Sequence, residues 1–298
     1  MSGQGSLSIA QERTGALVAP PSGADLHAGG TAARSRLTAA LSPLVERLPA
    51  GDQVVVTVPT LRQVLVDPDR LGRPEEPFRW KSAFARRSLG LAVVEACASG
   101  RFRAPAQAVG PIADEAVAEW ERTGWRTFHW EPWLAGLTSG ARAMVLADAV
   151  GWATGVWSSL DWRSLAPGTQ VGGAYDQWVC PAPRTVRLKA RSEVRVPIPG
   201  SDPDSADQPT SGQRTALVSV SGGCPAPGWA DELAYLALVA GLRSTSRPIP
   251  ARVMGLWPDA GIHRCVEIDV AALDRVTDRV VASVAAVVEA RLAVVPAS

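Results

Sequence analysis

Three consecutive segments decide the fold of this chain: TVRLKARSEVRVP at Thr185–Pro197, TALVSVSGG at Thr215–Gly223, and WADELAYLALVAGL at Trp229–Leu242. The first two carry β-branched residues in the pattern of strands, whereas the third repeats apolar residues at helical spacing. A polar loop separates the two strands. The order strand, loop, strand, helix predicts an α/β core in the second half of the chain.

Short motifs in these segments resemble those of the PD-(D/E)XK nuclease superfamily, specifically its RecB-like branch. Ala190-Arg191-Ser192-Glu193 stands in the place of G-R-x-D, and Asp231 to Tyr235 stands in the place of Q-x-x-x-Y. In that family these motifs converge with a (D/E)-x-K motif on Mg²⁺. The resemblance implies a mixed β-sheet core flanked by helices, with a helical subdomain in front of it.

The central motif departs from the family pattern, because Ser219-Val220-Ser221 stands where (D/E)-x-K is expected. Mg²⁺ takes oxygen ligands and needs one or two carboxylates, and a cation beside the attacking water stabilises the developing charge on phosphorus. Two serine hydroxyls supply neither full charge. We therefore expect a nuclease-like protein without hydrolysis and without a cofactor, which acts as a binding or structural component, for example of a DNA-processing complex.

Two alternatives remain open from the sequence. The first is an active Mg²⁺-dependent deoxyribonuclease, in which Glu193 is the metal ligand. Lys189, Arg191 and Glu193 alternate along one strand and so share a face; Asp231 and Tyr235 complete this set of catalytic candidates. The second is an α/β interaction module that docks a protein through its tryptophans, eight of which lie between Trp80 and Trp162. Indole rings also fill helical cores, which is the structural explanation of the same pattern.

Composition limits the classes of partner. The chain has 298 residues, 46% of them hydrophobic, and a net charge of +1, as in ordinary soluble globular proteins. Binding of nucleic acid through overall charge is disfavoured, but a local basic patch remains open. The segment 78–100 is expected to be a helix with a basic start, which is typical of a solvated face and also suits phosphate contacts. The candidate nucleic-acid-binding residues are Arg79, Lys81, Arg86, Arg87 and Arg191.

Other features exclude several functions. The four cysteines are scattered without a C-x-x-C pair, so neither a zinc ribbon nor a disulfide framework is indicated. No nucleotide-binding glycine motif, secretory signal or membrane span is visible. We expect a cytoplasmic protein with a protein partner and no membrane or nucleotide cofactor. Its Ala, Val, Arg and Gly content is typical of high-GC bacterial genomes.

Three regions are expected along the chain. Residues 1–33 have the composition of a disordered leader, 34–165 form a mainly helical subdomain with one strand, and 166–298 form the α/β core. A polar loop at 198–213 carries Asp202, Asp204 and Asp207, whose carboxylates would be poorly preorganised for a metal ion.

Overall fold

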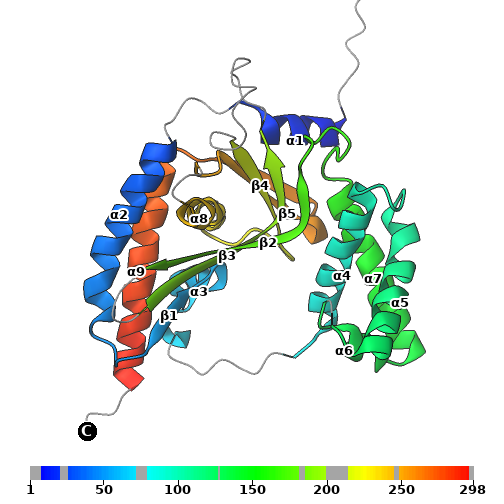
Figure 1. The fold of residues 1–298 in the computed structure, drawn as a ribbon, viewed down its shortest axis with the longest axis horizontal. Helices are drawn as coiled ribbons and strands as arrows, with labels where there is room; N and C mark the ends of the chain where they lie inside the picture. Colours follow the sequence, from blue (N-terminus) through cyan, green and yellow to red (C-terminus); the bar gives the residue numbers. More distant parts are fainter. Residues whose placement is uncertain are drawn as a thin grey trace, which may run out of the picture.

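The computed structural model describes residues 8–20, 26–71, 79–126, 128–180, 185–198, 214–244 and 248–294. Over these residues the chain is an α/β protein in which helices flank an open, mixed sheet (Figure 1). The sheet has six strands, and helices in the first half of the chain pack together beside it. The expected fold class is therefore confirmed.

The long strand β3 organises the sheet. On one edge it pairs antiparallel with β2, and on the other edge it pairs with two different strands, β1 in parallel and β4 in antiparallel orientation. The sheet continues through β5, parallel to β4, to β6, antiparallel to β5. The strands are β1 (Gln53–Val56), β2 (Gln170–Cys180), β3 (Thr185–Pro197), β4 (Thr215–Val220), β5 (Arg252–Trp257) and β6 (Ile262–Glu267).

The core lies between the sheet and three helices. All residues of β5 are buried, as are all residues of α8 (Trp229–Leu242) from Glu232 onward. A helix that is apolar on all sides must be covered on all sides. The sheet covers one side of α8, and α2 (Leu26–Val45) and α9 (Val270–Val294) cover the other, where they run side by side (Figure 1).

A second helical layer contacts the opposite side of the sheet. It consists of α4 (Ser82–Ala98), α5 (Pro105–Thr123), α6 (Glu131–Ala135) and α7 (Ser139–Trp157). Helices α4 and α7 pack closely, because a Cβ on Gly90 would lie 2.4 Å from the Trp152 ring. We call these four helices the helical subdomain. An ion pair of 2.7 Å between Arg86 and Asp259 ties it to the turn η3 (Pro258–Ala260), which follows β5.

Two sequence expectations need correction. The disordered leader is wrong for much of 1–33: α1 (Ile9–Val18) has a capping box between Ser8 and Gln11, and α2 already begins at Leu26. Residues 34–165 also do not form one subdomain apart from the sheet. Strand β1 and helix α2 belong to the sheet and its cover, and α3 (Val58–Val66) contacts α8 and α9. The sequence did not show this because β1 pairs with β3, which lies more than a hundred residues later in the chain.

Most tryptophans are packed within the protein. Trp130, Trp152 and Trp162 are among the buried residues of the core, and Trp157 stacks on Trp162 at 5.5 Å between ring centroids. Only Trp125 is largely exposed, at 71%. The core-filling explanation therefore accounts for the tryptophan-rich segment better than a docking surface does.

Candidate functional site

The sheet is split along one edge of β3. Strand β1 pairs with β3 as far as Val56 opposite Leu188, and the pairing of β4 with β3 ends at Val218 opposite Val194. Because β1 is parallel and β4 antiparallel to β3, the carboxyl ends of both strands converge on the intervening residues 189–193. Ligands in open α/β sheets bind where carboxyl ends of strands meet beside a break in strand order.

Two side chains replace the missing ladder bonds at the split. The Tyr235 hydroxyl of α8 donates to the Val56 carbonyl at 2.7 Å and lies 3.3 Å from the Lys189 carbonyl. The Glu193 Oε2 atom accepts the Val220 N–H at 2.8 Å, just beyond the last paired residues of β4. Buried backbone groups require such partners. Tyr235 and Glu193 therefore hold the two strand ends at fixed positions.

Glu193 is buried with both carboxylate oxygens engaged. Its Oε1 atom accepts a 2.7 Å hydrogen bond from the Arg87 guanidinium of α4, and the Nε atom of Arg191 lies 3.7 Å away. The Glu193 side chain is 0% exposed, whereas that of Arg87 is 40% exposed. This carboxylate joins the helical subdomain to the split sheet. A divalent ion could use it only by displacing these partners.

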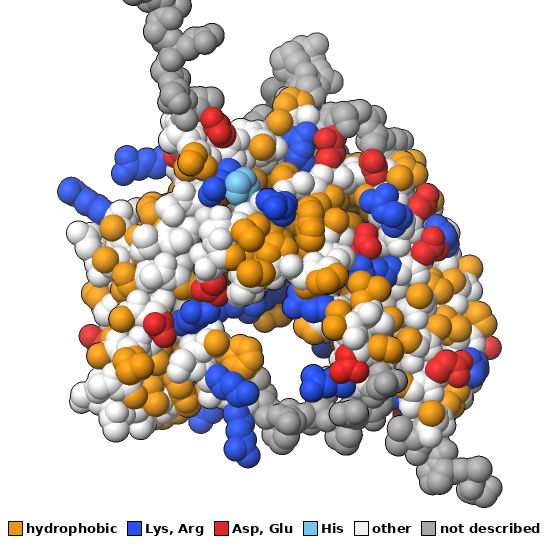
Figure 2. Space-filling view, turned by 180° about the vertical axis from the view of Figure 1, so that it is seen from behind, with side chains coloured by type: hydrophobic (Ala, Val, Ile, Leu, Met, Phe, Trp, Pro, Cys, Tyr) orange, Lys and Arg blue, Asp and Glu red, His pale blue; other side chains and the backbone are white. Residues whose placement is uncertain are grey.

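A pocket of about 540 Å³ opens at the split. Residues from six elements and their flanking turns line it, among them the two serines Ser219 and Ser221 at the end of β4. Figure 2 shows an opening between the helical subdomain and the rest of the molecule, with Lys and Arg side chains on its rim. The lining residues are Thr57, Val58, Pro59, Arg62, Arg87, Tyr175, Lys189, Ala190, Arg191, Ser219, Ser221, Gly222 and Leu236.

The pocket is cationic. Arg62, Arg87, Lys189 and Arg191 line it, and none of the described lining residues carries a carboxylate. Two of the four cations have buried acidic partners: Arg87 pairs with Glu193, and Arg62 pairs through Nε and Nη2 with Glu232 at 2.9 and 2.7 Å. Hydrogen bonding to Glu232 raises the pKa of Arg62. Four cations against two carboxylates leave an excess of two positive charges.

Lys189 and Arg191 carry that excess. Lys189 is exposed, and within the described ranges its ammonium has no carboxylate partner. The start of α3 adds to the positive potential because Thr57, Val58 and Pro59 at its N-terminus line the same pocket. The hydroxyls of Ser219 and Ser221 provide neutral hydrogen-bond donors. Together these groups favour an anion with several oxygen acceptors.

Tyr175 stands at the mouth of this pocket. It lies on β2 directly opposite Arg191, and its side chain is 70% exposed. The Arg191 guanidinium lies 5.0 Å from the centre of the Tyr175 ring, and its Nη1 atom donates to the Tyr175 hydroxyl at 3.0 Å. An arginine so placed is attracted to the face of the ring. The cation and the aromatic ring are therefore held as one unit.

The bulge in β2 makes room for this pair. Gly172 and Gly173 both have positive φ, at 114° and 92°, where the register of β2 against β3 shifts. A Cβ on Gly173 would lie 2.9 Å from the Arg191 guanidinium, and one on Gly172 would lie 2.5 Å from the Glu95 carboxylate. Only glycine fits both the backbone conformation and these close approaches.

The residues expected from sequence fall into two groups. The pocket collects Lys189, Arg191 and Arg87, with Glu193 directly beneath them. Asp231 does not line it; its carboxylate pairs with Arg279 of α9 at 2.8 Å. Tyr235 is fully buried at the split and does not line the pocket either, and burial raises its pKa far above the ordinary value.

The other predicted basic residues lie outside the pocket lining. Arg86 pairs with Asp259, which also accepts the Gly223 N–H at 3.1 Å. Arg79 and Lys81 are exposed at the start of α4. The basic residues at the start of this helix therefore have different roles. Arg86 forms a structural ion pair, Arg87 lines the pocket, and Arg79 and Lys81 are exposed.

Two pocket residues, Arg62 and Tyr175, were missed by sequence reasoning. Arg62 lies on the helix that directly follows β1, and a site at the end of that strand would have drawn attention to it. Tyr175 lies six residues before Pro181 in the sequence, and nothing in its local pattern distinguishes it. Both become visible only once β1 and β2 are known to flank β3.

Metal ligands are sparse in the described part of the chain. There, no group of three or more His, Cys, Asp or Glu side chains is arranged to hold a metal ion. Asp202, Asp204 and Asp207 lie outside the described residues. Glu193 and Asp231, the candidate carboxylates of the alternative Mg²⁺-dependent nuclease, are each held by an arginine.

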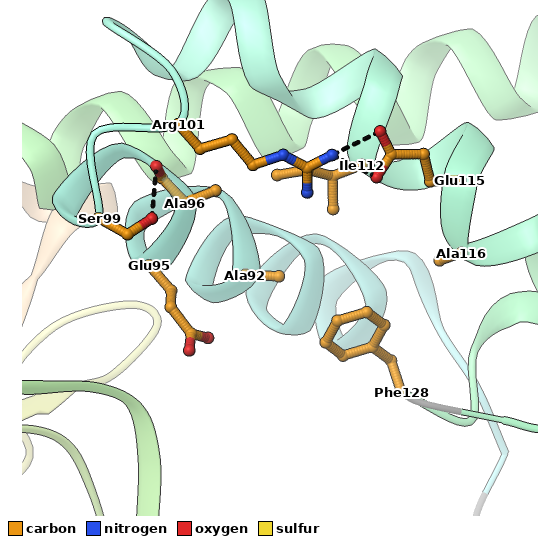
Figure 3. Close-up of a pocket in the computed structure, with 9 residues that line it drawn as sticks. All are labelled: Ala92, Glu95, Ala96, Ser99, Arg101, Ile112, Glu115, Ala116 and Phe128. Carbon is orange, nitrogen blue, oxygen red and sulfur yellow. Dashed lines mark hydrogen bonds and ion pairs between the residues drawn. The ribbon is translucent and has the colours of Figure 1, made fainter.

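A second pocket, of about 370 Å³, lies between α4 and α5 and has a different character (Figure 3). Its arginine, Arg101, is paired with Glu115 at 2.5 Å, and the Glu95 carboxylate points away from that pair. Burial raises the pKa of Glu95. The described lining residues of this pocket include an acid but no unpaired cation, so the pocket at the split is the better candidate for an anion.

None of the helices in the described ranges combines the length and the apolarity needed to cross a membrane. Comparison with protein-family models, with curated proteins and with solved structures finds no match to this chain. Its function must therefore be argued from the site itself.

Proposed function

We propose that this protein is a nuclease-like protein without hydrolytic activity that binds the phosphate backbone of a nucleic acid in the cationic pocket. The observation that carries the proposal is the composition of the pocket: four cations and two serine hydroxyls are among the described residues that line it. The buried acids that partner two of these cations, Glu193 and Glu232, are already held by hydrogen bonds. The resemblance of the β3 and α8 motifs to RecB-like nucleases supports nucleic acid as the polyanion.

The donor set suits a phosphodiester. Arginine binds phosphate oxygens through two parallel N–H groups, and lysine binds them as a point charge. Arg191 and Lys189 alternate on β3 and both line the pocket, so two adjacent oxygens of one phosphate, or two successive phosphates, are within their reach. Such contacts hold the backbone and do not select a base sequence.

The same geometry disfavours hydrolysis. Metal-dependent hydrolysis, in which water attacks phosphorus and displaces the leaving oxygen, needs carboxylates that anchor Mg²⁺ near the phosphate. If Glu193 were recruited for this, the Arg87 guanidinium and the Val220 N–H would lose their partner. An unpaired buried donor costs about 1–3 kcal/mol. The Mg²⁺-dependent nuclease therefore remains the second hypothesis, and it needs a rearranged Glu193.

The proposal includes a cytoplasmic protein that works with a protein partner in DNA processing. A subunit that binds nucleic acid without cleaving it fits a role beside an enzyme that acts on the same nucleic acid. The exposed charges at the start of α4, Arg79 and Lys81, lie outside the pocket and are available for the protein partner.

The test is fluorescence anisotropy with labelled oligonucleotides, measured at several salt concentrations in EDTA. For a single strand, the slope of log K against log salt is about 0.7 per phosphate contact, so engagement of Lys189 and Arg191 predicts a slope of about −1.4. Lys189→Ala should make the slope shallower by about 0.7. Affinity that does not depend on salt would contradict the proposal.

The chain offers a matched control, because Lys81 is its only other lysine. Lys81→Ala changes the net charge equally but lies outside the pocket. Under the proposal it leaves the slope unchanged. An equal loss in both variants would locate the contact at the start of α4 instead of at the split.

A further inference from the structure

We propose that Tyr175 is a base-stacking platform beside the phosphate pocket, and that the ligand of the pocket is therefore a single-stranded nucleic acid. This inference rests on the proposed phosphate binding and specifies the form of the nucleic acid. It follows from the position of an exposed aromatic ring next to the cations that have no acidic partner of their own.

The ring is held in place for such a contact. Tyr175 and Arg191 are direct cross-strand partners, and two contacts fix the ring: the guanidinium against its face and the hydrogen bond to its hydroxyl. Its side chain is nevertheless 70% exposed and lines the pocket. The edge strand β2 thus presents an ordered aromatic surface to solvent, where a ring that served only the core would be covered.

Tyr175 and Arg191 lie close enough together to contact one nucleotide. A base and its phosphate are separated by a single sugar, and the Tyr175 ring centre lies 5.0 Å from the Arg191 guanidinium. A phosphate on Arg191 and Lys189 would therefore leave its own base, or the adjacent base, near the ring. Stacking of bases on aromatic side chains beside a basic groove is how proteins bind single strands without sequence preference.

A duplex does not satisfy the same site. Its bases are stacked on each other inside the helix, so an aromatic ring on the protein surface reaches them only after costly unstacking. The phosphates of a duplex could still reach Lys189 and Arg191. The contribution of Tyr175 is therefore what distinguishes a single strand from a duplex in this pocket.

The test compares three ligands of equal length by anisotropy in EDTA: a single-stranded oligonucleotide, its duplex, and a single strand of abasic sites with the same number of phosphates. The wild-type protein should bind the single strand about 10-fold more tightly than the abasic strand. Tyr175→Leu should remove that advantage, and leave the affinity for the abasic strand within about twofold. Tyr175→Phe should keep most of the advantage because the ring remains.

Controls separate this inference from the proposed function. Trp125→Leu removes an aromatic ring that is equally exposed but lies outside the pocket, and it should change nothing. Equal wild-type affinity for the three ligands would overturn the stacking platform and leave phosphate binding intact. An equal loss for all three in Tyr175→Leu would also overturn it, because Tyr175 would then act only by positioning Arg191. Failure of the wild type to bind any of them would overturn both proposals.

Discussion

Helix α4 contributes to two pockets that carry opposite charge. Near its start, Arg87 lines the pocket at the split sheet. There the nearby acids are paired with arginines, and two cations are left in excess. Near its end, Glu95 lines the pocket against α5. There Arg101 is paired with Glu115, and the carboxylate of Glu95 is left in excess. The comparison teaches that ion pairing, and not the number of charged residues, decides what a pocket offers to a ligand.

Charge reversal should expose this difference most strongly. Lys189→Glu places an acid beside Arg191 in the cationic pocket, and it should weaken oligonucleotide binding by about 100-fold, since it removes one charge-assisted contact and adds repulsion. Glu95→Lys makes the opposite change in the second pocket and should alter affinity by less than about twofold. Anisotropy at low salt measures both variants. A comparable effect of the two substitutions would mean that the pockets form one binding surface.

The two tyrosines of the chain sharpen the comparison between architecture and binding. Tyr235→Phe removes the hydroxyl that joins α8 to the carboxyl end of β1, so the free energy of unfolding should fall by about 1 kcal/mol. Tyr175→Phe removes an exposed hydroxyl and should change the free energy of unfolding by less than about 0.5 kcal/mol. Urea denaturation followed by circular dichroism measures both. If Tyr235→Phe lowered oligonucleotide affinity without lowering stability, the catalytic or binding role implied by the Q-x-x-x-Y resemblance would regain support.

The sequence allowed the fold class and most elements to be predicted. The alternation in β3 placed Lys189, Arg191 and Glu193 on one face, and the apolar repeat at Trp229–Leu242 predicted helix α8. These features depend on local periodicity, which a sequence shows directly.

The site was predicted only in part. Lys189, Arg191 and Arg87 were identified by type and position, but their convergence depends on how β1 and β4 meet at β3, which no local pattern contains. Arg62 and Tyr175 were missed for that reason. The partners of Glu193 and Asp231 also lie far away in sequence, on α4 and α9, so the sequence could not show that both acids are engaged.

The smallest expected effect concerns the pH dependence of the acidic pocket. Burial raises the pKa of Glu95 above its ordinary value of 4.5, so the folded protein holds this proton more tightly than the unfolded chain does. The contribution of Glu95 to stability is therefore present below that value and is lost as the pH rises through the raised pKa. Between pH 4 and pH 7, the free energy of unfolding of Glu95→Gln, measured by urea denaturation, should rise slightly relative to that of the wild type. If the variant instead became less stable relative to the wild type as the pH rises, the folded protein would have to stabilise the charged carboxylate.

Glu193 provides the most direct test of the central claim, that this pocket binds phosphate and does not cleave it. Glu193→Gln keeps the shape of the side chain, removes a negative charge and frees Arg87. Wild-type and variant proteins should be incubated with labelled single-stranded and duplex DNA in Mg²⁺, and their affinities measured in EDTA, with circular dichroism to confirm folding. The account predicts no cleavage by either protein and binding about fivefold tighter in the variant. Mg²⁺-dependent cleavage by the wild type that disappears in Glu193→Gln would contradict it.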